Sequence, residues 1–280
     1  MSVPAHRESS LLPQAPCVFE ADCTVKRNEP VTGDYRLLVL NAPRAVLDCE
    51  PGQFFHLLCP TTEDHTPYLR RPMSIYGFFP ETGELHFLYK VAGEGTGALA
   101  TLMPGDTLNV LGPLGIGFDI APDWRRLLLV ARGVGLATLA PLALKARALD
   151  RTLTAICSAR SKDLLMSRDY FEQLGVRVIA VTDDDGSSDV ENLRAIIEDL
   201  IRSDGVDAFY TCGSNRLLKL LQSIGRAHAI PGQIALEQQM ACGLGMCQCC
   251  VRAFRADSGI VHRRVCRDGP VFDLQEAVGW

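Results

Sequence analysis

The chain has 280 residues, 47% of them hydrophobic and 22% charged, which is enough apolar material for two or three packed domains. Its formal net charge is -5, and its 28 lysine and arginine residues are scattered along the sequence. We therefore expect no nucleic-acid partner, because proteins that bind nucleic acids concentrate positive charge on one surface.

The start of the sequence shows no export signal. Residues 1–16 lack the apolar core of roughly 7–15 residues that a signal peptide needs. The longest uncharged apolar run follows Arg132 and is too short to span a bilayer. The sequence thus predicts a flexible tail over residues 1–16, a cytoplasmic location and no membrane contact.

Residues 17–120 contain short runs rich in β-branched and aromatic residues, separated by turn residues. Closely spaced short strands of this kind are typical of a barrel or a sandwich. The runs cover residues 17–27, 35–42, 52–59, 71–78, 84–92 and 106–112. We expect an N-terminal antiparallel β-barrel domain here.

Residues 121–230 alternate between apolar strand-like runs and helical patterns. Strand followed by helix, repeated, predicts a central α/β domain with a parallel sheet and right-handed crossovers. Strands are expected at residues 126–131, 152–159, 176–182 and 207–213, and helices at 135–149, 169–174, 190–201 and 215–227. The fold class as a whole is multidomain α+β, with residues 231–280 as a small third unit.

The third unit holds a cysteine pattern with a known chemistry. Cys242, Cys247, Cys250 and Cys266 follow the spacing C-x4-C-x2-C with a distant fourth cysteine, which is the plant-type [2Fe–2S] pattern. Cys249 lies inside the x2 gap, so we expect its side chain to point away from the metal. A structural zinc site is the alternative, although zinc sites usually have two separated cysteine pairs.

The other cysteines that lie singly in apolar segments are expected to be inert core residues, since free cysteine is often buried. They are Cys17, Cys23, Cys49, Cys59 and Cys157. The six histidines, including His56 and His86, show no ligand spacing and are interpreted as structural or surface groups.

Two motifs in the barrel region suit a flavin dinucleotide. Arg71, Pro72 and Ser74 could meet a pyrophosphate and the flavin ring. Gly95 and Thr96 belong to a glycine-rich turn that opens a helix, where free N–H groups favour phosphate. An iron–sulfur cluster carries single electrons, so a flavin that converts hydride pairs into single electrons is a fitting companion.

The order of these motifs resembles that of a known family. The chain carries R-P-M-S, then G-E-G-T, then V-L-G-P-L-G-I-G-F. A strand, a glycine-rich turn and a helix follow, and the cysteine segment with C-R-D-G-P-V-F comes last. This order is similar to that of the electron-transfer subunit of NAD-linked dihydroorotate dehydrogenase, within the ferredoxin-NADP reductase superfamily.

The resemblance implies an oxidoreductase subunit that binds FAD and [2Fe–2S] and relays electrons between NAD and an FMN-type catalytic flavoprotein of pyrimidine biosynthesis. The cysteine ligands would be those above. Residues 17–120 would bind FAD, residues 121–230 NAD(P), and residues 231–280 the cluster, which should fold over the flavin edge of the barrel. The residues implied for FAD are Arg71, Pro72, Met73, Ser74, Lys90, Gly95 and Thr96.

The nucleotide motif departs from the family pattern. Gly133 and Gly135 keep the tight turn, but Arg132 stands where a glycine is usual. Cys212 keeps the cysteine of the C-G-P motif, whose proline is Ser214 here. Gly133, Gly135 and Cys212 are therefore candidate nicotinamide-binding residues, and Arg132 is either a surface cation or a new phosphate contact. Two further cations, Arg160 and Lys162, could favour NADPH or be solvated.

Two other functions stay open at this point. The same relay could serve a hydrogenase, a sulfite reductase or a ferredoxin:NADP transhydrogenase. Alternatively, the chain could be a non-enzymatic, zinc-stabilised binding protein that has lost the dinucleotide. The sequence shows no nucleophile and base pair for a separate catalytic reaction, which suits a relay.

Overall fold

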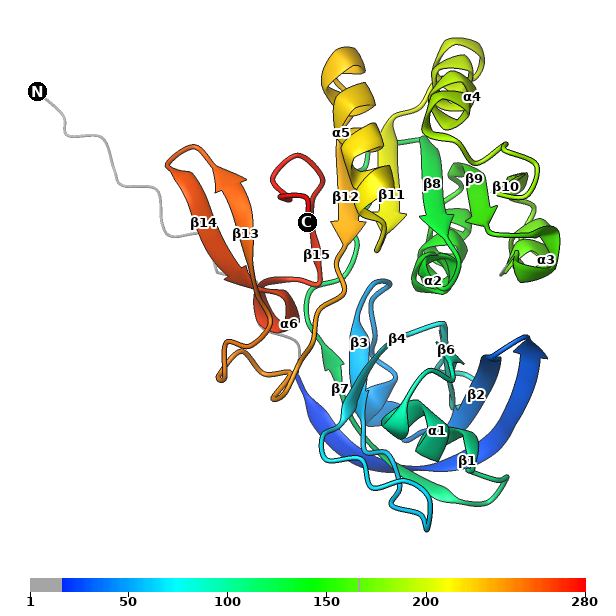
Figure 1. Ribbon diagram of the computed structural model, residues 1–280, viewed down its shortest axis with the longest axis vertical. Helices are drawn as coiled ribbons and strands as arrows, with labels where there is room; N and C mark the ends of the chain where they lie inside the picture. The colour runs from blue at the N-terminus through cyan, green and yellow to red at the C-terminus, as the bar shows by residue number, and fades with distance from the viewer. Residues whose placement is uncertain (1–16, 166) are drawn as a thin grey trace, which may run out of the picture.

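The computed structural model describes residues 17–165 and 167–280, and the tail predicted for residues 1–16 lies outside the described residues. Two sheets dominate the molecule, with a smaller hairpin beside them (Figure 1). Within the described ranges, no helix is long and apolar enough to cross a membrane.

The N-terminal part of the chain forms an open antiparallel sheet of seven strands, which curls into a half-barrel (Figure 1). The strand order is β4-β3-β7-β1-β2-β6-β5. Large apolar side chains fill the curl, and Phe55 and Phe87 meet edge to face with ring centroids 5.8 Å apart. The elements are β1 (Phe19–Thr32), β2 (Tyr35–Asn41), η1 (Arg44–Val46), β3 (Phe54–Leu57), β4 (Arg71–Ser74), β5 (Gly77–Phe79), β6 (Glu84–Lys90), α1 (Glu94–Ala100) and β7 (Thr107–Leu114).

The central part is a sheet with strand order β10-β9-β8-β11-β12-β15, parallel except for β15. Helices cover both faces of this sheet, and its strands carry apolar side chains on both sides. Along β8, Leu127 and Leu129 pack with α2, whereas Leu128 and Val130 pack with α4 and α5. The elements are β8 (Arg126–Arg132), α2 (Gly135–Ala148), β9 (Thr152–Ala159), η2 (Lys162–Leu164), α3 (Arg168–Gln173), β10 (Arg177–Thr182), α4 (Val190–Ser203), β11 (Ala208–Cys212) and α5 (Asn215–His228).

The C-terminal part is joined to this sheet by two of its own strands. β12 (Gly232–Ala235) extends the sheet from β11, and β15 (Val271–Asp273) pairs antiparallel with β12. Between them lie the cysteine loop, a hairpin of β13 (Val251–Ala256) and β14 (Gly259–Arg264), and the short helix α6 (Val265–Asp268). Phe254 of the hairpin packs on Phe272 of β15, with ring centroids 4.2 Å apart.

Most strands and helices expected from the sequence are present, with ends that differ by a few residues. The single strand expected at residues 71–78 is instead two strands, β4 and β5, at opposite edges of the seven-stranded sheet. One expectation about the core is wrong. Cys23, Cys49, Cys59 and Cys157 are buried, but Cys17, which precedes β1, is exposed.

The side chain of Gln222 ties α5 to the C-terminal segment. Its Nε2 group donates to the carbonyl oxygens of Leu274 and Ala277, at 2.7 and 2.8 Å, and Gln222 is only 5% exposed. Replacing it with methionine keeps the volume but removes both hydrogen bonds. The Leu274 carbonyl then loses its side-chain donor, whereas the Ala277 carbonyl keeps Arg255 Nη1 at 2.8 Å. We expect Gln222→Met to lower the free energy of unfolding by about 1–3 kcal/mol in denaturant titrations.

The matched control lies one turn along the same helix. Arg226 donates to Gln275 at the exposed surface, so Arg226→Met is expected to change stability by less than about 0.5 kcal/mol. Equal losses in the two variants would contradict a role for the buried pair of hydrogen bonds.

Candidate functional site

One large cavity lies where the half-barrel, the central sheet and the C-terminal segment meet. Its volume is about 800 Å³, within the range of small-molecule and cofactor sites. Each part of the chain supplies a wall. The lining residues are Phe54, Tyr68, Leu69, Arg70, Arg71, Pro72, Met73, Ser74, Leu88, Tyr89, Lys90, Val134, Ala137, Thr138, Leu236, Glu237, Gln238, Gln239, Met240 and Pro270.

The half-barrel wall is built on β4, which carries four of the predicted residues. Antiparallel pairing with β3 sets Ser74 opposite Phe54 and Arg71 opposite Leu57. Arg71 to Ser74 all line the cavity, as does Lys90 at the end of β6. Three cationic residues of the half-barrel, Arg70, Arg71 and Lys90, therefore line the cavity.

The glycine-rich turn lies behind Arg71 rather than among the described lining residues. A Cβ on Gly95 would lie 2.7 Å from Arg71 Cζ, so only glycine lets the guanidinium pack there. The Thr96 hydroxyl accepts hydrogen bonds from the N–H groups of Ala92 and Gly93, at 2.9 and 3.1 Å. Gly95 and Thr96 thus shape the turn that supports Arg71.

The central wall comes from the turn between β8 and α2. Gly133 takes a left-handed φ of +55°, and the residues that follow it, Val134, Ala137 and Thr138, line the cavity. Gly135 sits so close to β11 that a Cβ would lie 3.0 Å from the Cys212 carbonyl oxygen. Gly133, Gly135 and Cys212 therefore come together at the carboxyl ends of β8 and β11, where open parallel sheets bind ligands.

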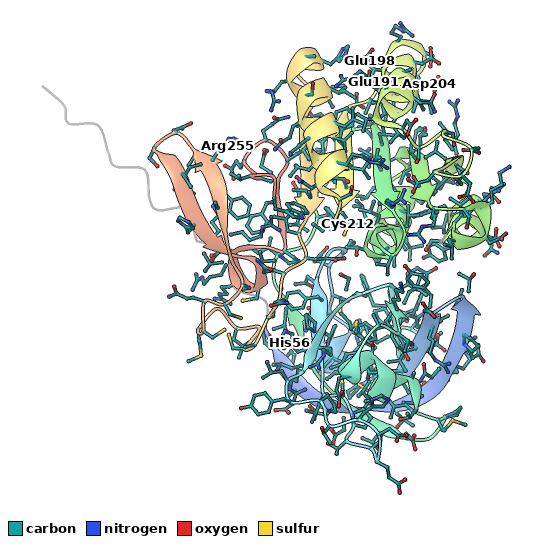
Figure 2. The ribbon with its side chains drawn as sticks, in the orientation of Figure 1. His56, Glu191, Glu198, Asp204, Cys212 and Arg255 are labelled. Atoms are coloured by element: carbon teal, nitrogen blue, oxygen red, sulfur yellow. The ribbon has the colours of Figure 1, made fainter. Side chains whose placement is uncertain are left out.

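Cys212 lies at the end of its strand, facing the half-barrel (Figure 2). Burial, followed by the nearby charge of Glu237, raises the pKa of its thiol to about 12. The side chain is therefore a neutral thiol near pH 7 and not a nucleophile.

Arg132, for which the sequence left open a surface cation or a phosphate contact, is partly exposed and paired with an acidic side chain. It forms a two-pronged ion pair with Asp183, which begins the loop after β10, with Nη1 and Oδ1 2.9 Å apart. This contact, together with that from Ser188, holds the pKa of Asp183 well below its usual range. The ion pair joins the carboxyl ends of β8 and β10, at the edge of the sheet where the dinucleotide is expected.

The cysteine loop begins directly after the cavity wall. Leu236 to Met240 line the cavity and lead from β12 into Cys242. The sequence analysis did not identify this run, although its position between a strand and the first cysteine was a usable signal. The cysteine loop and the cavity are thus continuous along the chain.

The four predicted ligands form two groups. Cys250 and Cys266 are buried with their Sγ atoms 3.2 Å apart. Cys242 Sγ accepts hydrogen bonds from the N–H groups of Leu244 and Cys247, at 3.4 and 3.5 Å. Hydrogen bonds from the backbone of Cys249 and Cys242 lower the pKa of the Cys247 thiol to about 6, which favours the thiolate that metals bind.

The side chain of Cys249 is expected from the sequence to point away from this group, but it points toward Cys247. Its sulfur lies 3.5 Å from that of Cys247 and accepts a hydrogen bond from the Ala241 N–H group at 3.2 Å. Among the described residues, no three side chains of metal-binding type already surround a common point. The cysteines are arranged as pairs on one loop and one short helix.

The expected docking of this segment on the half-barrel is observed. A Cβ on Gly115, which follows β7, would lie 2.5 Å from the Gly269 carbonyl oxygen, and the Ile116 N–H group donates to that oxygen at 2.6 Å. Gly243 of the cysteine loop contacts His56 of β3. The C-terminal segment therefore closes the edge of the half-barrel that carries β3, β4 and β7.

Comparison with known proteins identifies the C-terminal segment first. Residues 237–278 match the model of the iron–sulfur cluster binding domain of dihydroorotate dehydrogenase B. Among solved structures, the NADH-dependent reduced ferredoxin-NADP oxidoreductase superposes with a TM-score of 0.75 and 27% identity, covering 91% of this chain and 88% of that chain. The ferredoxin-NADP+ reductase of Plasmodium falciparum, at 15% identity and a TM-score of 0.60, shares the fold over 75% of this chain and 90% of that chain.

Curated relatives cover most of the chain. The electron transfer subunit of dihydroorotate dehydrogenase B (NAD(+)) from Caldanaerobacter subterraneus subsp. tengcongensis is 38% identical over 229 residues, 81% of this chain and 87% of the relative. The subunit of that name from Bacillus mycoides is 36% identical over 234 residues, 82% of this chain and 87% of the relative. The chain belongs to the family of electron transfer subunits of NAD-linked dihydroorotate dehydrogenase B.

Proposed function

We propose that this chain relays electrons between NAD and a catalytic flavoprotein subunit that oxidises dihydroorotate, using FAD and a [2Fe–2S] cluster. The observation that carries the proposal is the cavity that all three parts of the chain line and from which the chain leads into the cysteine loop. Electron transfer requires cofactors that lie close together, and the run from Leu236 to Met240 leads from the cavity wall directly into the cysteine loop. When bound, flavin would exchange hydride pairs for single electrons, and the cluster would carry single electrons.

The cavity fits FAD by its chemistry. Arg71 and Lys90 supply positive charge for a pyrophosphate, and guanidinium groups suit phosphate oxygens well. Ser74 supplies a hydroxyl, and Pro72 and Met73 supply apolar surface for the ring system. Gly95 and Thr96 act indirectly in this proposal, by giving Arg71 its place. We propose residues 17–120 as the FAD-binding domain.

The cysteine set fits a [2Fe–2S] cluster. Four thiols in two groups, with backbone N–H groups directed at two of the sulfurs, suit a cluster of two irons that each take two thiolates. Cys242, Cys247, Cys250 and Cys266 are the proposed ligands, within a cluster domain of residues 231–280. Cys250 and Cys266 would be the two buried ligands of the cluster.

The nicotinamide dinucleotide is assigned to residues 121–230. Gly133 and Gly135 would let it approach the turn, and Cys212 would lie near the nicotinamide ring as a neutral thiol. The exposed Arg160 and Lys162 follow β9, and the Arg160 carbonyl oxygen accepts a hydrogen bond from the Asp183 N–H group at 3.1 Å. We propose NAD as the working nucleotide, because the relatives that cover most of the chain are named as subunits of an NAD(+) enzyme.

Gly95→Ala tests the assignment of FAD to Arg71. The added methyl group must displace the guanidinium, and a charge-assisted contact contributes about 1.5–3 kcal/mol, so we expect the Kd for FAD to rise about tenfold or more. Fluorescence titration of the flavin-free protein measures it.

Gly93→Ala is the matched control in the same turn. Gly93 has an extended backbone, and a Cβ there would meet nothing within 4 Å, so FAD binding should change little. An unchanged affinity in Gly95→Ala would contradict a role for Arg71 in FAD binding.

Cys266→Ser and Cys249→Ser distinguish ligands from bystanders. We expect Cys266→Ser to lose at least about half of the bound iron and the visible bands of the cluster, because a proposed ligand in a buried pair is removed. Cys249→Ser should keep both. Iron analysis and EPR of the reduced proteins measure the outcome, and equal losses would overturn the ligand assignment.

Reconstitution tests the proposed function directly. The chain, purified with its cofactors, is mixed with an FMN-type dihydroorotate dehydrogenase catalytic subunit, and NADH formation from dihydroorotate is followed by absorbance. We expect activity that depends on both subunits and falls at least tenfold with Cys266→Ser. A stable complex that reduces no NAD would contradict the proposal, and activity only with a hydrogenase or sulfite reductase subunit would replace the partner.

A further inference from the structure

His56 is a fully buried histidine whose ring nitrogens lack partners among the described residues. It lies on β3, opposite Pro72 of β4 and Leu111 of β7, and is 0% exposed. Neither ring nitrogen has a hydrogen-bond partner in the described part of the chain. Buried polar atoms without partners are rare in folded proteins, so this side chain calls for a ligand or a function.

The imidazole lies between the cavity and the cysteine loop. Its ring centroid is 5.8 Å from that of Phe54, which lines the cavity. On its other side, a Cβ on Gly243 would lie 2.9 Å from both Cε1 and Nε2 of His56. Figure 2 shows His56 on the side of the half-barrel that faces the cysteine loop. Gly243 directly follows Cys242, so the ring touches the loop beside the first proposed ligand.

The ring is neutral at physiological pH. Burial, and then the positive charge of Arg70, lower the pKa of His56 to about 4. A neutral imidazole carries one N–H donor and one acceptor nitrogen. The donor has no oxygen acceptor here, whereas the neighbouring loop is rich in sulfur that becomes anionic when it binds metal.

We propose that His56 is a positioning residue for the [2Fe–2S] cluster: it holds the cysteine loop on the half-barrel through Gly243, and its free N–H donates to a sulfur of the bound cluster. A hydrogen bond to sulfur stabilises the negative charge that the cluster gains on one-electron reduction, so His56 raises the reduction potential. This inference rests on the proposed function, because it requires the cluster to be present.

The first test compares reduction potentials by redox titration followed by EPR. His56→Phe keeps a buried ring without an N–H, and His56→Gln keeps a donor. We expect the equilibrium constant for reduction of the cluster to fall about tenfold in His56→Phe. For one electron, this lowers the reduction potential by about 59 mV. His56→Gln should stay closer to the wild type. Equal potentials in the wild type and His56→Phe would overturn the proposal.

His86→Phe is the matched control. His86 is the other histidine in a strand of the half-barrel; it lies on β6, and its Nε2 pairs with Glu84 at 2.9 Å. The same substitution there removes an imidazole from the half-barrel without touching the cysteine loop, so the potential of the cluster should not change. A shift equal to that of His56→Phe would show a general effect of destabilising the half-barrel and would also overturn the proposal.

A second measurement uses the wild-type protein and does not depend on how the variants fold. With 15N-labelled histidine, pulsed EPR of the reduced cluster should detect one weakly coupled imidazole nitrogen. A cluster signal without that coupling would overturn the role of His56 but leave the proposed function in place. A wild-type protein without any cluster signal overturns the proposed function, and the role of His56 with it.

Discussion

The pairing of β15 with β12 is the constraint on which the site depends. β12 extends the central sheet and then runs as Leu236 to Met240 along the cavity into the cysteine loop. β15 brings the chain back through Pro270, which lines the same cavity, to pair with β12. Both ends of the cysteine segment are thus held by backbone hydrogen bonds of one sheet, and the loop between them is confined to the edge of the half-barrel.

The same geometry explains how one chain can serve several cofactors. The half-barrel supplies cations and one wall, the turn after β8 supplies the second, and the C-terminal segment supplies the third. Close approach of Gly115 to the Gly269 carbonyl oxygen, and contact of Gly243 with the His56 ring, join the C-terminal segment to the half-barrel. The ion pair of Arg132 with Asp183 lies at the carboxyl ends of β8 and β10, and neither residue lines the cavity.

Much of this could be predicted from the sequence, because the signals were local. Alternating apolar runs indicated both sheets, and the spacing from Cys242 to Cys250 indicated the cluster loop. Contacts between distant residues could not be predicted in this way. Three features depend on segments far apart in the chain: the pairing of β12 with β15, the ion pair of Arg132, and the burial of His56. Neither the exposure of Cys17 nor the direction of Cys249 could be read from composition, because each depends on the neighbouring backbone.

The central claim is that nicotinamide, flavin and cluster sites in this chain are connected. Anaerobic titration of the purified protein with NADH and then NADPH, followed by its visible spectrum, tests this claim most directly. The account predicts that NADH bleaches the flavin and cluster bands together, and that NADPH is the weaker reductant. A coloured protein that neither nucleotide reduces would contradict it, because the turn containing Arg132 would then no longer admit the dinucleotide.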